Sequence, residues 1–274
     1  MIFTCPICKQ RLNRSENVYT CPNGHSYDIA SEGYVHLLPP NRMHSKAPGD
    51  TKQMVASRRA FLGTGLYGLF SDKLNELVNA NLRTEQPVIL DAGSGEGYYT
   101  GRLYESLLAH GLKPELYGFD ISKCAVKAAA KKYRAISFAV ASCFEIPAAD
   151  NSADCIINVF APIVESELLR VMKPGGFLIL AVPGPRHLFG LKEILYDAPY
   201  ENEYRETEYD GFRFESRTAV RDEIRIQSAQ TISDLFAMTP YYWKTPAEGS
   251  RRLNNTKELT TEIEFDFLVY RKVR

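Results

Sequence analysis

Short apolar runs recur through the middle of the chain, and each is followed by a stretch with helical spacing. These runs predict five buried strands, at residues 88–90, 116–119, 136–141, 155–159 and 177–182. A sixth strand-like run, at 262–270, ends the chain. Strands that alternate with helices are typical of a parallel sheet with helices on both faces. The pattern therefore predicts an α/β domain.

Two helices are predicted ahead of the first strand. Asp50 can cap a helix that ends near Leu62, and apolar residues between 70 and 82 recur at helical spacing. Residues 38–49 are rich in turn formers and basic side chains, which is typical of a linker. We therefore predict a module at 1–37, a basic linker at 38–49 and a larger domain at 50–274.

Three of the six cysteines lie in the first 21 residues. Cys5 and Cys8 are separated by two residues, and Cys21 and His25 by three. Two such pairs of soft donors match a closed, tetrahedral zinc site, which leaves no position for a reactive water. Because about forty residues cannot build a self-sufficient core, we expect the metal to supply folding free energy. Chelation should then unfold this module and leave the rest folded.

Composition narrows the class of protein. The 274 residues are 45% apolar and 24% charged, and the formal net charge is zero, which excludes a disordered or supercharged chain. No apolar run approaches the roughly 18 residues that span a bilayer, and the N-terminus does not resemble a signal peptide. We therefore expect a cytoplasmic protein without a membrane segment. Residues 1–60 carry eight basic and four acidic side chains, so this end should attract polyanions.

A glycine-rich loop follows the first strand of the α/β domain. Gly93, Gly95 and Gly97 alternate with other residues directly after Asp91. Glycines there let a ligand approach the backbone, and the helix that follows presents its N–H groups. Tyr98 stands where a dinucleotide-binding loop needs its third glycine, and no P-loop pattern occurs.

An acid followed by G-x-G-x-G resembles motif I of class I S-adenosylmethionine (SAM)-dependent methyltransferases. The resemblance implies that the loop wraps the methionine part of SAM, with Asp91 near its ammonium group. Asp120 ends the second strand, where a carboxylate can accept both ribose hydroxyls. Ile121 follows it, and the Lys173-Pro174-Gly175-Gly176 turn also recurs in these enzymes.

Nearly the whole chain resembles the RlmA family of 23S ribosomal RNA (guanine-N1)-methyltransferases. The matching segments are the Cys5/Cys8/Cys21/His25 module, Glu32–Val35, Pro48–Asp50, Arg58–Leu62, Gly95–Thr100, Asp120–Lys123, Ala161-Pro162 and Pro183–His187. The resemblance implies a Rossmann-like methyltransferase sheet, SAM and one structural zinc ion. It also implies methyl transfer to N1 of a guanine in a hairpin of 23S ribosomal RNA, and a possible homodimer.

The resemblance also assigns site residues. Glu96 and Gly97 would line the SAM loop, Tyr67 would close over the cofactor, and His187 would lie near SAM or the target base. The fourth strand ends where these enzymes contact the target base. Asn158, Phe160 and Pro162 are the candidates there. The sequence identifies no catalytic base.

Two other functions fit part of the pattern. A methyltransferase of a small metabolite would use the zinc module as a lid, and an RNA-binding protein would keep SAM only as a structural ligand. The basic N-terminal end favours RNA, and Arg58 and Arg59 are the residues we expect to grip it. The acidic segment 197–223 resembles an insertion, and no function is assigned to it.

Overall fold

The structure is a computed structural model that describes residues 1–43, 45, 48–203 and 207–273. The predicted linker and the acidic segment therefore each lie partly outside the described residues. Within that part of the chain, no helix is long and apolar enough to cross a membrane.

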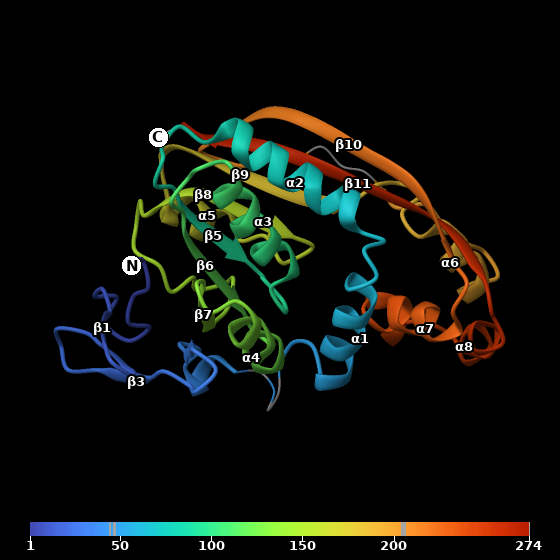
Figure 1. Ribbon diagram of the computed structural model, residues 1–274, viewed down its shortest axis with the longest axis horizontal. Coiled ribbons are helices and arrows are strands. Elements are labelled where there is room, and N and C mark those ends of the chain that lie inside the picture. Colours follow the sequence, from blue (N-terminus) through green and yellow to red (C-terminus); the bar gives the residue numbers. More distant parts are fainter. Residues whose placement is uncertain (44, 46–47, 204–206, 274) are drawn as a thin grey trace.

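One eight-stranded sheet organises the molecule (Figure 1), in the order β10-β11-β9-β8-β5-β6-β7-β4. Its strands are β4 (Tyr34–His36), β5 (Val88–Ala92), β6 (Glu115–Asp120), β7 (Ser137–Val140), β8 (Ala153–Val159), β9 (Met172–Pro183), β10 (Phe212–Ile226) and β11 (Leu259–Lys272). The strands from β4 to β9 pair in parallel, whereas β11 pairs antiparallel with both β9 and β10. The predicted strands are confirmed, but the sheet is mixed rather than purely parallel.

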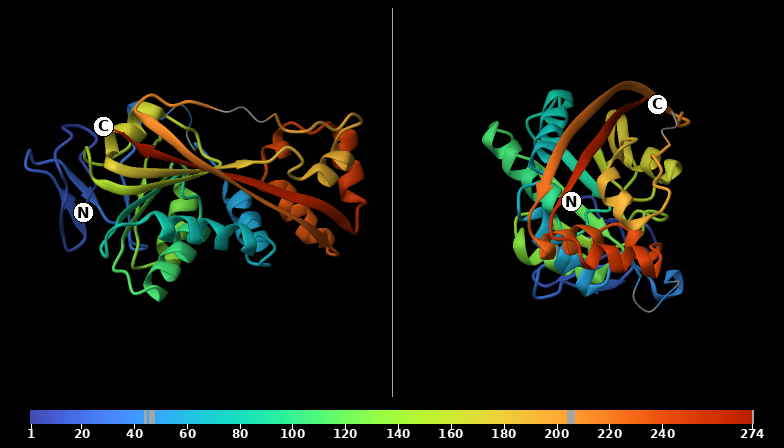
Figure 2. Two further views of the ribbon diagram at one scale, coloured as in Figure 1. Left: turned by 90° about the horizontal axis from the view of Figure 1, so that it is seen from above. Right: turned by 90° about the vertical axis from the view of Figure 1, so that its right-hand side faces the viewer.

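Helices cover both faces of this sheet. They are α1 (Lys52–Leu62), α2 (Gly68–Asn81), α3 (Tyr98–Ala109), α4 (Lys123–Lys132), α5 (Glu165–Val171), α6 (Phe189–Leu195), α7 (Ala229–Ala237) and α8 (Ala247–Asn254), with short 3-10 turns η1 (Pro40–Arg42) and η2 (Pro240–Trp243). Figure 2 shows β10 and β11 crossing the molecule, with α6, α7 and α8 at the end far from the N-terminus.

The N-terminal module completes one face of the sheet. Its own small sheet is β1 (Asn13–Ser15), β2 (Val18–Thr20) and β3 (Ser26–Asp28). Phe3 packs edge-on against Tyr117 of β6, with 5.3 Å between ring centroids, and joins a core cluster that also contains α5 residues. β4 then enters the main sheet beside β7. The module is thus part of the same folded body as the strands that follow.

Two local expectations are corrected. The N-cap of α1 is Thr51 rather than Asp50, because the Thr51 hydroxyl accepts the Met54 N–H while Asp50 pairs with Arg58. Residues 173–176 were expected to form a turn between helix and strand, but they lie inside β9 as an irregularity in its pairing with β8. The Ser122 cap of α4 is present, with its hydroxyl accepting the Ala125 N–H.

Candidate functional site

The glycine loop connects β5 to α3 in a conformation that requires glycine. Gly93 has φ = 92°, and a Cβ there would lie 2.2 Å from the Cβ of Ala161. Gly97 has φ = 84° and begins α3. A side chain at either position would meet both backbone strain and a neighbouring residue. The loop is therefore fixed against the end of β8, open to a ligand on its other side.

A cavity of about 660 Å³ opens beside this loop, at the carboxyl ends of β5, β6, β8 and β9. Ligands of doubly wound α/β sheets bind at this edge, where neighbouring strands connect in opposite directions. All but one of the predicted cofactor and base residues line it: Tyr67, Asp91, Gly93, Gly95, Glu96, Asp120, Ile121, Asn158, Phe160, Pro162 and His187. Gly97 does not, and contributes through the turn of the backbone.

Asp91 presents an unpaired oxygen in the cavity wall. The Thr100 hydroxyl donates to one carboxylate oxygen at 2.6 Å, and the other, Oδ1, has no partner among the described residues although it is fully buried. Burial raises the pKa of Asp91 to about 7, opposed by the Thr100 bond and reinforced by the charge of Asp120. A buried acceptor without a donor is costly, so this arrangement fits a cationic ligand group.

Asp120 holds the loop and faces the same cavity. Its two oxygens accept the N–H of Gly95 at 3.0 Å and of Ser122 at 2.8 Å. Burial nevertheless raises the pKa of this carboxyl group above its usual value. Each carboxylate oxygen has a second lone pair, which can accept a hydroxyl of a ligand.

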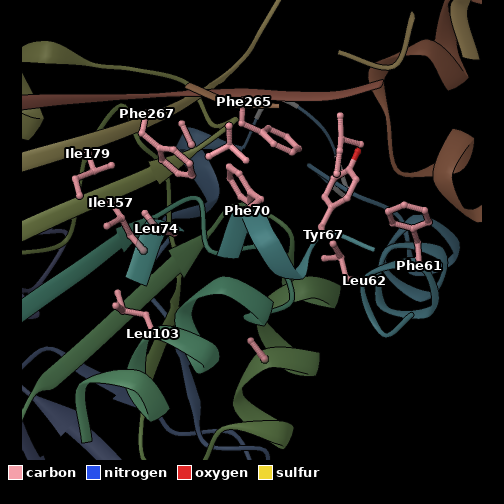
Figure 3. Packing of buried hydrophobic residues seen from close by; sticks show 14 of the residues in the cluster. Phe61, Leu62, Tyr67, Phe70, Leu74, Leu103, Ile157, Ile179, Phe265 and Phe267 are labelled. Carbon is pink, nitrogen blue, oxygen red and sulfur yellow. The ribbon is translucent and has the colours of Figure 1, made fainter. Parts of the chain in front are cut away.

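The opposite wall is aromatic. The ring of Phe265 in β11 lies 5.2 Å from the ring of Tyr67 and 4.6 Å from that of His187, centroid to centroid. Figure 3 shows Tyr67 and Phe265 side by side above the core. The Tyr67 hydroxyl is buried and has no partner in the described part of the chain.

His187 is held as a neutral hydrogen-bond donor. Its Nδ1 accepts the Glu264 N–H at 3.2 Å, so the proton of the neutral ring lies on Nε2. Burial, with a smaller effect of Lys192, lowers the pKa of His187 to about 3.

Phe160 stands at the mouth of the cavity in a strained conformation. Its φ is 57°, a region that bulky residues rarely adopt, and its side chain is 47% exposed. Strain of this kind is retained at functional sites. Asn158 supports the turn, because its amide accepts the Ala161 N–H and donates to the Pro162 carbonyl, both at 3.3 Å. The Asn158 amide is thus engaged within the turn, so Phe160 is the more available of the two for a base.

Sequence reasoning missed a group of residues that close the cavity from the other side. Arg58 in α1 pairs with Asp50 and donates to the Met238 carbonyl at 3.2 Å, and all three line the cavity. Arg58 was expected on an RNA-binding surface, but its guanidinium is engaged here. Gly49 marks this closure, since a Cβ there would lie 2.8 Å from Ile121. The adjacent Gly49-Asp50 pair in the sequence was the available signal.

The predicted zinc ligands come together at the other end of the molecule. The donor atoms of Cys5, Cys8, Cys21 and His25 all lie within 4.8 Å of one another. Cys8 Sγ is 3.5 Å from Cys21 Sγ, and His25 Nδ1 is 3.3 Å from Cys21 Sγ. Three thiols and one imidazole at such separations fit a tetrahedral zinc ion.

Comparison with known proteins agrees with both sites. Residues 3–46 match the family model described as “RlmA, N-terminal”, and residues 89–176 match a methyltransferase domain. A Bacillus halodurans structure, provisionally named a methyltransferase, shares the fold with a TM-score of 0.50 at 13% identity, covering 74% of this chain and 100% of its own.

Two curated relatives match almost from end to end. The 23S rRNA (guanine(748)-N(1))-methyltransferase of Streptomyces fradiae is 32% identical over 95% of this chain and 94% of its own. A Micromonospora griseorubida protein is 30% identical over 94% of this chain and 92% of its own, and its name assigns it 23S rRNA guanine-N1 methylation provisionally.

The sheet order, the glycine loop after β5 and the cavity at the strand ends define a class I SAM-dependent methyltransferase. The zinc-ribbon match and the extent of the identity make the assignment narrower. The chain belongs to the 23S rRNA (guanine-N1)-methyltransferase family.

Proposed function

We propose that this enzyme transfers a methyl group from SAM to N1 of a guanine in a hairpin of 23S ribosomal RNA. The observation that carries the proposal is the identity with the Streptomyces fradiae enzyme over 95% of the chain, which includes both the zinc ribbon and the cavity. The aromatic mouth of the cavity supports it, because a flipped purine needs a flat apolar partner.

Three groups of the chain are proposed to hold SAM. The free Oδ1 of Asp91 accepts from the ammonium group, directly or through water, and Asp120 accepts from the ribose hydroxyls. Glu96, Gly95 and Gly93 form the wall around the methionine part, with Gly97 setting the turn. Ile121, Tyr67 and His187 enclose the remaining sides of the cofactor.

Bound SAM supplies an electrophilic methyl group on its sulfonium. The protein's main contribution is alignment of the attacking nitrogen. We propose that Phe160 stacks on the target guanine, while Asn158 and Pro162 keep Phe160 in its strained turn. The Nε2–H of His187 is a donor that needs no change of protonation near neutral pH. No residue is assigned as the acceptor of the guanine N1 proton.

The alternative substrate is a small metabolite, with the zinc module as a lid over the cavity. The structure disfavours a lid, because the module packs on a face of the sheet and supplies an edge strand. An RNA-binding protein without catalysis would have no use for an unpaired carboxylate in its cavity. The expected homodimer and cytoplasmic location stay predictions.

The test is methyl transfer from radiolabelled SAM to purified 23S ribosomal RNA that lacks the modification, followed by mass mapping. We expect one 1-methylguanosine within one hairpin. Asp120→Asn should abolish transfer, whereas Asp222→Asn, on the exposed side of β10, should not. Transfer to small acceptors alone, or to another base, would contradict the proposal.

A further inference from the structure

Two neighbouring helices at the rim of the cavity carry only basic charge. α1 has three basic residues (Lys52, Arg58, Arg59), α4 has four (Lys123, Lys127, Lys131, Lys132), and neither contains an acid. Each of the other six α-helices that the structure describes contains at least one Asp or Glu. Because the whole chain is neutral, this is a local concentration of positive charge.

The two helices run side by side (Figure 1). At one end, the Ser122 hydroxyl donates to the Asp50 carbonyl at 2.7 Å, which joins the starts of α4 and α1. Further along, Arg59 and Lys132 line one cavity of about 400 Å³ between the helices, beside Glu96 of the SAM loop. We call the five cations that have no carboxylate within 4.0 Å among the described residues the basic face: Lys52, Arg59, Lys123, Lys131 and Lys132.

The positions of two of these lysines are unfavourable for the helices. Lys52 and Lys123 are the first residues of α1 and α4, where the helix macrodipole disfavours a cation, and no acid in either first turn offsets them. Lys131 and Lys132 end α4 and complement its dipole, so local stability explains them. It does not explain the two N-terminal lysines, whose charge must serve a contact outside the chain.

We propose that the basic face binds the phosphates of the substrate RNA next to the nucleotide that enters the cavity. The inference rests on the proposed function, because it names the surface on which that RNA lies. Its position decides for RNA over an acidic protein, since Asp50, Arg58 and Ile121 at the helix starts already line the cavity that must receive the base. Fixed cations on rigid helices position a nucleic acid backbone without reading its sequence.

The proposal relocates the expected RNA contact from the zinc module and linker to α1 and α4. Lys127 is not part of the face, because it pairs with Glu32 of the module at 2.9 Å. Arg134 is likewise engaged, donating to the carbonyls of Ser31 and Glu32. The module therefore orients α4 from one side and leaves its remaining lysines exposed.

The test compares two triple variants of equal charge. The first is Lys52→Gln, Lys123→Gln and Lys131→Gln, none of which lines either cavity. The control is Arg83→Gln, Lys113→Gln and Lys257→Gln, which are equally exposed but lie outside α1 and α4. The dissociation constant for transcribed 23S ribosomal RNA is measured between 50 and 300 mM salt, about the range in which phosphate contacts are separated. SAM affinity is measured by calorimetry.

Each phosphate contact contributes about −0.7 to −0.9 to the slope of log affinity against log salt. The first triple variant should therefore show a slope shallower by about 2 to 3, the control a slope close to that of the parent, and both an unchanged SAM affinity. Its thermal midpoint should not fall, because glutamine at a helix start relieves the unfavourable dipole contact.

Equal slopes for the two triple variants would overturn the proposal. A parent protein that methylates 23S ribosomal RNA while the slopes stay equal would refute the basic face alone. A parent that neither binds nor methylates this RNA would refute the proposed function, and the two failures are thereby distinguishable.

Discussion

Replacing Asp91 by asparagine should make the free protein more stable and the enzyme unable to hold its cofactor. The carboxyl group is buried with one oxygen unpaired, and its pKa is raised from 3.8 to about 7. Above pH 7, keeping it ionised in the fold therefore costs about 4 kcal/mol, at roughly 1.4 kcal/mol for each unit. An asparagine keeps the oxygen that accepts from Thr100 and leaves one amide unpaired, at a cost of about 1 to 3 kcal/mol. The net gain is about 1 to 3 kcal/mol at pH 8.

The sign of the pH dependence follows from the raised pKa. Between pH 4 and 7 the carboxyl group is ionised in the unfolded chain but protonated in the fold, so the parent loses stability as the pH rises through this window. Below pH 4 the group is protonated in both states, and the advantage of the variant should disappear. The assay is urea unfolding without SAM at pH 4, 6 and 8.

Calorimetry supplies the second half of the test. Loss of a charge-assisted hydrogen bond worth about 1.5 to 3 kcal/mol should weaken SAM binding by about 10- to 150-fold. Asp222→Asn, an exposed carboxylate on β10, is the control and should change neither quantity. A variant that is less stable than the parent at pH 8, or that binds SAM as tightly, would refute this account of Asp91.

The remaining predictions concern packing, the base site and the metal. Gly93→Ala should destabilise the protein by about 2 to 5 kcal/mol in urea unfolding, through overpacking and backbone strain, and adding Ala161→Gly should recover part of that loss; no recovery would exclude the predicted clash. Phe160→Ala should lower kcat/KM for RNA at least about tenfold, through loss of stacking worth about 1 to 3 kcal/mol, with SAM affinity unchanged, and Phe160→Trp should retain activity; equal losses in both would count against stacking. Chelation, or Cys8→Ser, should increase amide exchange across the module and also in β7, and unchanged exchange in β7 would show that β4 does not depend on the metal.

The parts of the site that sequence predicts are those with local signals. Asp91 and Asp120 directly follow apolar runs, and the loop glycines and zinc ligands have diagnostic spacing. Arg58 carries no such signal, because its partners Asp50 and Met238 come from segments far apart in the chain. A basic residue beside another basic residue is most simply read as surface, and only the folded chain shows that one of the pair faces the cavity.

The two missed strands fail for different physical reasons. β4 has only three residues, too few for a period, and its partner β7 is distant in sequence. β10 carries a charged residue at nearly every second position, because it is the edge strand and one of its faces meets solvent. Its arginines are balanced by acids of β11, as where Arg217 and Arg221 both pair with buried Asp266. Charge-rich composition there predicts an insertion rather than a strand.

The pairing of β4 with β7 has a consequence for how the protein is made. A ribosome releases the metal-binding segment first, and its knuckles need nothing downstream to close around an ion. Tyr34, however, waits for Phe138 to be synthesised before it has a neighbour. Until then the nascent chain exposes an apolar side, which includes Phe3 and Leu37, and depends on late translation to cover it. Metal supply during synthesis therefore acts on the yield of active enzyme, before any question of turnover arises.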